Sequence, residues 1–188
     1  IPGFFSAIAA GKAENLLAAP IALKINGKDL SAAKSDFRWI EKSKDLAVSE
    51  QKIKVSDSTE LKIRHELEFD NFIKTTVTVK PEGMFKAESM VLDIPLKSEF
   101  AKQIHATCNS MKYNATHSLP EREGELWNSK EGKLHLSVSN NFRPYIWLGN
   151  MAEGIAFFAE NDKKIYYYDA RVDINSDAIL LGSRNIIK

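Results

Sequence analysis

The sequence predicts an all-β protein, built as an antiparallel β-sandwich with one or two short helices. Three observations predict this fold class. Apolar and polar residues alternate with period two along much of the chain, and turn-forming residues separate the alternating runs. The third is that no strands alternate with long helical patterns, as they would in a doubly wound fold. Many short strands joined by turns are typical of antiparallel sandwiches and barrels.

Length and charge bound the class of protein. The chain has 188 residues, which predicts one domain over residues 1–188 at about 150 residues per domain. Because it begins at Ile1 rather than Met, we expect a processed chain or a fragment of a longer one. The net formal charge of +1 argues against a nucleic-acid binder that works through bulk charge. The single cysteine, Cys108, can form neither an internal disulfide nor a Cys-based zinc site.

The first elements expected along the chain are a short helix and a hairpin. The helix is placed near Ser6 to Leu17, within an apolar N-terminal segment too short to span a membrane. The apolar run from Ile21 to Ile25 precedes Asn26-Gly27, the dipeptide that favours a two-residue hairpin turn. We therefore expect two antiparallel strands on either side of that dipeptide.

The clearest alternation predicts a second hairpin. Its first strand runs from Leu61 to Phe69, with apolar residues and His65 on one face and charged residues on the other. The second runs from Ile73 to Val79, after a turn at Asp70-Asn71. We expect the whole apolar face, including Leu67, to be buried, with His65 as a hydrogen-bonded core residue.

Short strands are also expected through the rest of the chain. Apolar runs bounded by Gly, Asn, Asp or Ser predict strands near residues 90–96, 134–138, 145–148, 155–158, 165–168 and 178–181. Between the first two of these runs, Ser98 to His105 is predicted to be a second short helix. Ser98 would cap it, and Phe100 and Ile104 would share one face.

Motifs for catalysis and for metal binding are mostly absent. The chain has no Gly-x-Ser-x-Gly elbow, no phosphate-binding glycine-rich loop and no Cys-x-x-Cys. The segment starting at Asp173 opens like a calcium loop, but Ala178 and Arg184 replace its glycine and its final glutamate. We therefore predict no catalytic residue, no metal site and no cofactor in this chain.

Aromatic residues gather in the last third of the chain and offer a candidate sugar-binding surface. Tyr145 and Trp147 alternate on a predicted strand, and a sugar can stack its C–H face on such rings. Core packing is the competing interpretation of alternating aromatics. The polar side chains expected beside the rings, for binding a carbohydrate or docking another domain, are Arg143, Asn150, Glu153 and Glu160.

Residues 142–150 and 153–162 carry a resemblance. The first segment contains Pro144-Tyr145-Ile146-Trp147-Leu148-Gly149-Asn150, and the second contains Gly154-Ile155-Ala156-Phe157-Phe158-Ala159-Glu160-Asn161-Asp162. Together they resemble the N-terminal β-sandwich domain of glycoside hydrolase family 123 and related bacterial glycosidase-like proteins. Phe157 stands where that pattern commonly has Trp, and Asn161 stands where it commonly has Ser. The resemblance covers roughly residues 60 to 165.

The resemblance implies a function for the parent chain rather than for this part of it. Family members act on N-acetyl-β-galactosaminides through an adjacent Asp-Glu pair in a (β/α)₈ barrel. This chain contains no Asp-Glu dipeptide and is too short for a barrel of about 250 residues. The leading expectation is thus a non-catalytic, supersandwich-like domain that packs on the catalytic barrel of the same parent chain and shapes a glycan cleft. The resemblance also implies a bacterial, periplasmic or extracellular protein, although a cytoplasmic one is not excluded.

Two other functions stay open. A free-standing carbohydrate-binding module would expose Trp127, Tyr145 or Trp147 as a stacking platform. A mutarotase-like sugar enzyme would need a histidine and a carboxylate flanking one pocket. The histidines available for that role are His105, His117 and His135, with Glu153 or Glu160 as the carboxylate.

Two local expectations follow for the segment around Trp147, and the exposure of Trp147 separates a binding surface from core packing. On a strand, Ile146 and Leu148 point opposite to Trp147, so the indole should share a face with Tyr145 and be partly exposed. Gly149 is expected to adopt a positive φ in a turn before Asn150, where a larger residue would be strained.

Overall fold

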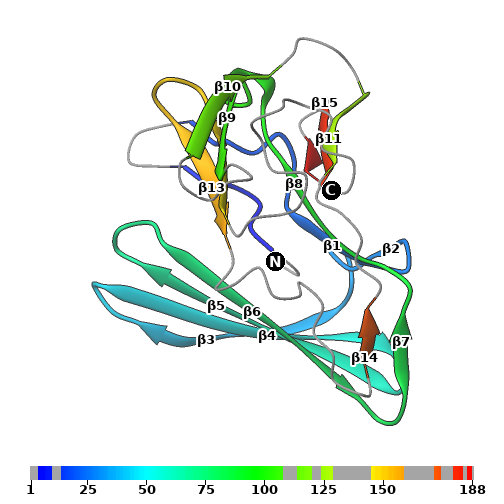
Figure 1. The fold of residues 1–188 in the computed structure, drawn as a ribbon. Helices are drawn as coiled ribbons and strands as arrows, with labels where there is room; N and C mark the ends of the chain where they lie inside the picture. Colours follow the sequence, from blue (N-terminus) through cyan, green and yellow to red (C-terminus); the bar gives the residue numbers. More distant parts are fainter. Residues whose placement is uncertain are drawn as a thin grey trace. The chain divides into compact units, whose positions relative to one another are not determined.

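The computed structural model describes residues 4–9, 14–107, 114–119, 124–128, 145–158, 172–174, 180–183 and 186–187. These residues form sixteen strands and one short 3₁₀ helix, so the predicted all-β class with antiparallel sheets is confirmed (Figure 1). The chain divides into two compact units, one built mainly from Ala22–Met90 and the other mainly from Val91–Tyr166. Each unit is described by itself below.

The first unit is organised around a four-stranded antiparallel sheet, in the order β3-β4-β5-β6 (Figure 1). Its strands are β3 (Ser35–Lys42), β4 (Leu46–Ser56), β5 (Thr59–Glu68) and β6 (Ile73–Pro81). The same unit contains β1 (Ala22–Ile25), β2 (Lys28–Asp29), β7 (Phe85–Ala87) and β14 (Val172–Ile174). β7 and β14 pair in parallel, whereas the other pairs in this unit are antiparallel.

The predicted hairpin over β5 and β6 is confirmed. Leu61 pairs with Val79 and Leu67 pairs with Ile73, and Asn71 takes a positive φ of 69° in the turn. Burial alternates along β5 as expected, because Leu61 and Ile63 are fully buried while their neighbours are partly exposed. His65 is also buried, and its Nδ1 lies 2.9 Å from the Thr75 hydroxyl.

Burial does not extend to the end of the β5 apolar face. Leu67 is 37% exposed and Phe69, just beyond the strand, is 78% exposed. The expectation that Leu67 lies in the core is therefore wrong. Alternation specifies which face a side chain takes, but the end of a long hairpin can project beyond what covers that face.

The opposite face of this sheet carries charged side chains centred on Glu50. The Glu50 carboxylate is 2.6 Å from Lys62 Nζ, 2.7 Å from Arg38 and 3.3 Å from Arg64. Only 8% of the Glu50 side chain is accessible, so these three cations replace most of its hydration.

The predicted Asn26-Gly27 turn is confirmed. Asn26 and Gly27 both have positive φ, 50° and 76°, as a two-residue turn between β1 and β2 requires. The Asn26 side-chain oxygen also accepts hydrogen bonds from the backbone N–H groups of Glu88 and Ser89. This asparagine therefore fixes both its own turn and the segment that follows β7.

The second unit contains two antiparallel sheets. One has the order β10-β9-β12-β13, and the other includes β11-β15-β16-β8. Their strands are β8 (Met90–Pro95), β9 (Gln103–Thr107), β10 (Asn114–Ser118), β11 (Gly124–Asn128), β12 (Tyr145–Gly149), β13 (Gly154–Phe158), β15 (Leu180–Ser183) and β16 (Ile186–Ile187). The buried apolar residues of this unit include Leu96, Phe100, Ile104, Ile146 and Leu148.

The helix expected near Ser6 to Leu17 is absent from its described residues, 6–9 and 14–17. Instead, Asn15 Oδ1 accepts hydrogen bonds from the N–H groups of Ile8 and Leu17. Leu17 forms a β-bridge with Leu96. The Asn15 side-chain bonds and the pairing with the chain after β8 thus take the place of helical backbone hydrogen bonds in the described part of the segment.

The second predicted helix is much shorter than expected. Only Ser98–Phe100 is helical, as a single 3₁₀ turn, and its N-cap is Lys97 rather than Ser98. From Gln103 the chain is strand β9, because Ile104 and Ala106 alternate with outward residues and pair with β12. In the described part of the chain, no helix is long and apolar enough to cross a membrane.

Candidate functional site

The candidate site lies on one face of the β10-β9-β12-β13 sheet. Strand register places Thr116, His105, Trp147 and Ala156 in one row across its four strands. Because successive side chains point to opposite faces, Gln103 and Tyr145 share this face with the row. We call it the outer face of the sheet.

Trp147 takes the orientation expected from the sequence. Ile146 and Leu148 are buried at 4% and 3% exposure, whereas Tyr145 and Trp147 are partly exposed. The two aromatic residues therefore belong to the outer face, and the indole is partly accessible in this chain.

Two glycines, Gly149 and Gly154, leave room for the indole to lie against the sheet. Gly149 and Gly154 are paired across β12 and β13. A Cβ on Gly149 would lie 2.6 Å from Trp147 Cη2, and one on Gly154 would lie 2.6 Å from Trp147 Cε2. Both distances are shorter than the contacts that real Cβ atoms make. The indole ring therefore occupies the space that a side chain at either position would need.

Gly149 does not have the positive φ that was expected. The described glycines with positive φ are Gly27 and Gly83, and Gly149 is the last residue of β12. The expectation of a strained turn at Gly149 is therefore wrong. The reason for glycine there is steric, because a side chain would collide with the Trp147 ring and with the Glu153 carbonyl oxygen.

Asn150 closes the turn between β12 and β13. Its side-chain oxygen accepts hydrogen bonds from the N–H groups of Ala152, at 2.8 Å, and Glu153, at 2.9 Å. Its side-chain amide donates to the Glu99 carbonyl at 3.1 Å. Asn150 therefore positions the turn, and most of its hydrogen-bonding capacity is used in doing so.

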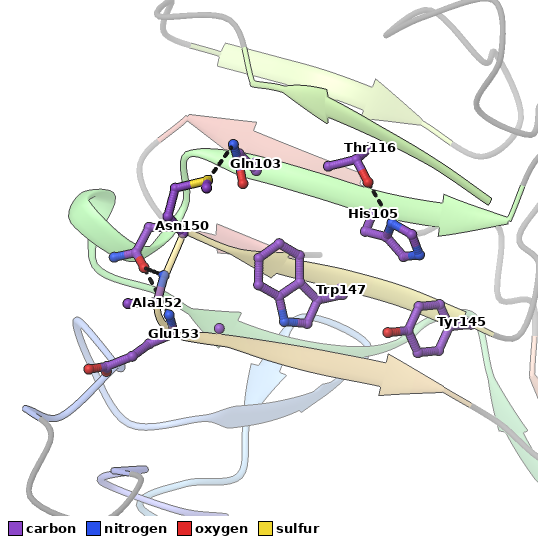
Figure 2. Close-up of a pocket in the computed structure, with 10 residues that line it drawn as sticks. Gln103, His105, Thr116, Tyr145, Trp147, Asn150, Ala152 and Glu153 are labelled. Atoms are coloured by element: carbon purple, nitrogen blue, oxygen red, sulfur yellow. Dashed lines mark hydrogen bonds between the residues drawn. The ribbon is translucent and has the colours of Figure 1, made fainter.

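The outer face carries an open hollow of about 390 Å³ beside this turn (Figure 2). It is lined by Gln103, His105, Thr116, Tyr145, Trp147, Asn150, Met151, Ala152, Glu153 and Gly154. Four of the predicted site residues, Tyr145, Trp147, Asn150 and Glu153, are thus brought together. The other two, Arg143 and Glu160, lie outside the described residues.

Polar and aromatic groups surround the indole. His105 Nδ1 lies 2.7 Å from the Thr116 hydroxyl, and the His105 ring meets the Tyr145 ring edge-on at 6.0 Å between centroids. The Tyr145 hydroxyl is directed toward Trp147 (Figure 2). The Gln103 amide nitrogen is 3.6 Å from the sulfur of Met151, a residue that is 90% exposed.

Glu153 contributes its backbone to the hollow more than its carboxylate. In Figure 2 the carboxylate points away from Trp147 and from His105. Its Oε2 is buried without a hydrogen-bond partner among the described residues. The role expected for Glu153, a carboxylate turned toward a ligand, is thus not seen in this arrangement.

Among the described residues, no histidine–carboxylate pair of the kind a mutarotase-like enzyme needs comes together at this hollow. His105 faces it, but the carboxylate of Glu153, which belongs to the described lining, is turned away. His117 follows Thr116 in β10 and so points to the opposite face of the sheet. His135 and Glu160 lie outside the described residues, as do residues 175–179 and Arg184 of the calcium-like loop.

Sequence reasoning missed Gln103 and Thr116 as site residues and considered His105 only as an acid or base. The signal was present as alternation of Gln103 and His105 with Ile104 and Ala106. A helix assigned over Ser98 to His105 concealed it, because Phe100 and Ile104 also fit a helical spacing. Within the described residues, no group of three or more His, Cys, Asp or Glu side chains could hold a metal ion.

The fold and site define an all-β domain that presents an aromatic surface, rimmed by polar groups, on one sheet face. A family model described as glycoside hydrolase 123, third domain, matches residues 4–166. The chain belongs to this family, which confirms the resemblance found in the sequence. The N-terminal position expected for the domain is not confirmed, since the matching description is of a third domain. No curated protein and no solved structure matches the chain.

Membership in this family makes the chain an accessory domain associated with a glycoside hydrolase. A third domain also implies a parent protein with further domains.

Proposed function

We propose that this chain is a non-catalytic domain that packs on the catalytic barrel of its parent protein and forms part of the wall of a glycan cleft. The outer face of β9 and β12 is the surface that would line the cleft. The observation that carries this proposal is the Trp147 indole, laid against the Gly149–Gly154 pair and open to the hollow.

The chemistry of the hollow supports contact with a glycan. A pyranose ring presents C–H groups that pack on an aromatic face and hydroxyl groups that need hydrogen-bond partners. In the hollow, the Trp147 ring can pack against the C–H groups, and Tyr145, His105 and Gln103 can hydrogen-bond to the hydroxyl groups. Sites of this kind combine an apolar floor with a few placed polar groups.

The residues present favour a binding role over a catalytic one. Acid–base catalysis on a sugar needs two titratable groups within reach of the same atoms. His105 and Glu153 are the titratable groups of that kind in the described lining, and the Glu153 carboxylate points away. The adjacent Asp-Glu pair of the family's catalytic barrel is also missing from this sequence.

The test is kinetic and uses the parent enzyme. Trp147→Ala should raise KM for an extended oligosaccharide several-fold, while kcat and the hydrolysis of a small aryl glycoside stay unchanged. Trp39→Ala is the matched control, since Trp39 is a 50% exposed indole on β3 of the other unit. Unchanged KM for the extended substrate in Trp147→Ala, with the enzyme correctly folded, would overturn the proposed cleft role.

A further inference from the structure

The Trp147 ring forms the floor of the hollow, and it is placed so that a ligand can stack on it. A tryptophan on an ordinary strand stands away from the sheet between neighbouring side chains. Here Gly149 and Gly154 leave that space empty, and the indole fills it. One side of the ring is thereby fixed against backbone, and the ring lines an open hollow. A rigid aromatic surface costs little conformational entropy when a ligand binds.

Spare hydrogen-bonding groups surround this floor. The Tyr145 hydroxyl and the Trp147 ring N–H make no hydrogen bond within the described part of the chain. Within the same residues, His105 bonds through Nδ1 and Gln103 through its amide nitrogen, so His105 Nε2 and the Gln103 side-chain oxygen have no partner there. Donors and acceptors are therefore both present, as several neighbouring hydroxyl groups would require.

The charge of the lining selects among sugars. No Lys or Arg is among the described residues that line the hollow, and its one carboxylate is turned away. A sugar carrying a carboxylate or sulfate would lose hydration there without gaining a cationic partner from the described lining residues. The volume of about 390 Å³ is at the small end of ligand sites, which span about 300–1,000 Å³.

We infer that the hollow is a binding site for one uncharged pyranose residue, which stacks on Trp147 and hydrogen-bonds to Tyr145, His105 and Gln103. The site is complete within this chain and does not need the catalytic domain. This inference rests on the proposed function, since it names the ligand class of the same surface. It goes beyond the proposed function in one respect, which is that the isolated chain binds the sugar by itself.

The experiment is calorimetry on the 188-residue chain with a panel of methyl glycosides. The neutral members are methyl β-galactoside, methyl β-glucoside and methyl N-acetyl-β-galactosaminide, and the acidic members are methyl glucuronide and methyl N-acetylneuraminide. At least one neutral glycoside should bind with a Kd on the order of 1 mM, typical for a single weak contact surface. The acidic glycosides should bind at least 10-fold more weakly.

Variants place the binding at the hollow. Trp147→Ala should abolish measurable binding, and Tyr145→Phe should weaken it about 2- to 10-fold through loss of one hydroxyl. Trp39→Ala should bind like the unmodified chain. If Trp147→Ala fails to fold, as judged by circular dichroism, Trp147→Phe keeps an aromatic ring of smaller area and should weaken binding at least 3-fold.

Four results would overturn the inference. They are no binding of any neutral glycoside at 10 mM, equal binding of acidic glycosides, equal loss in Trp39→Ala, and full binding in Tyr145→Phe together with Trp147→Phe. Failure here with a raised KM in the parent Trp147→Ala enzyme would mean that the surface needs the catalytic domain, so the proposed function would stand alone. Sugar binding by the isolated chain with unchanged parent kinetics would leave this inference and remove the cleft role.

Discussion

The Trp147 side chain packs against the sheet and is at the same time partly exposed. The ring covers two glycines in neighbouring strands, and an aromatic residue that covers a cross-strand glycine also stabilises a sheet. A purely structural tryptophan would account for the contact with the glycines. It would not require Tyr145, His105 and Gln103 to surround the ring with unused polar groups. The two roles can be separated by experiment.

The first prediction concerns the space beneath the indole. Gly149→Ala should lower the free energy of unfolding by more than about 1 kcal/mol, because the new methyl group would overlap the ring and the Glu153 carbonyl. Combining it with Trp147→Ala should give a coupling energy clearly different from zero in a double-mutant cycle measured by urea unfolding. Strictly additive effects would contradict the contact.

The second prediction concerns Glu50 and pH. Hydrogen bonds from Lys62 and then Arg38 lower the pKa of the Glu50 carboxyl from 4.5 to about 2. Because the folded pKa lies below the unfolded one, Glu50 stabilises the fold above pH 4.5, and that contribution declines as the pH falls from 4.5 toward 2. Thermal unfolding should show this decline in the unmodified chain, and Glu50→Gln should lack its share of it.

A matched control for Glu50 is Glu60, which is 3.8 Å from Lys52 at the surface of the same sheet. Glu60→Gln should change the free energy of unfolding by no more than about 0.5 kcal/mol. It should also keep the acid-dependent decline of the unmodified chain. If Glu50→Gln and Glu60→Gln have the same pH profile, the three cations around Glu50 do not act as described.

At the scale of single elements, alternation in the sequence predicted correctly which face of a strand is buried. It did not predict how far along the strand that burial extends. The faces of β5, β6 and β12 follow directly from period two, and Asn26-Gly27 marks its turn because both residues tolerate positive φ. The extent of burial along a strand depends on what covers it, which no local pattern contains. Leu67 is exposed for that reason although it shares a face with Ile63.

The third prediction uses this difference within β5. Ile63→Ala should cost about 2–5 kcal/mol of stability, because Ile63 is fully buried and its removal leaves a cavity. Leu67→Ala should cost less than half as much, since Leu67 is 37% exposed on the same face. Urea unfolding of the two variants, compared at equal m-values, checks the ranking. Equal costs would show that Leu67 is covered in solution.

The candidate site shows the same limit of local patterns. Tyr145, Trp147 and Asn150 could be selected because they lie together in the sequence. Gln103 and Thr116 could not, because they reach the site through the pairing of β9 with β10 and β12. A short segment such as Ser98 to His105 fits both a helix and a strand, and the long-range pairing decided between them.

At the scale of the whole molecule, residues 4–166 match one family domain, and the chain divides into two compact units. Because the proposed role is non-catalytic, the isolated chain should hydrolyse p-nitrophenyl N-acetyl-β-galactosaminide no faster than buffer does. The assay should be run from pH 4 to 8, so that a shifted optimum is not missed. A rate above buffer that scales with protein concentration, and that survives further purification, would contradict the non-catalytic role.

Both proposals require that the outer face around Trp147 binds a sugar. Nuclear magnetic resonance of the ¹⁵N-labelled chain, titrated with methyl N-acetyl-β-galactosaminide and methyl β-galactoside, tests it most directly. We expect saturable shifts in the amide signals of Gln103, His105, Thr116 and residues 145–154, and in the Trp147 indole N–H. Signals of the β3-β4-β5-β6 sheet should stay in place. Shifts confined to that sheet, or none at saturating sugar, would contradict the claim.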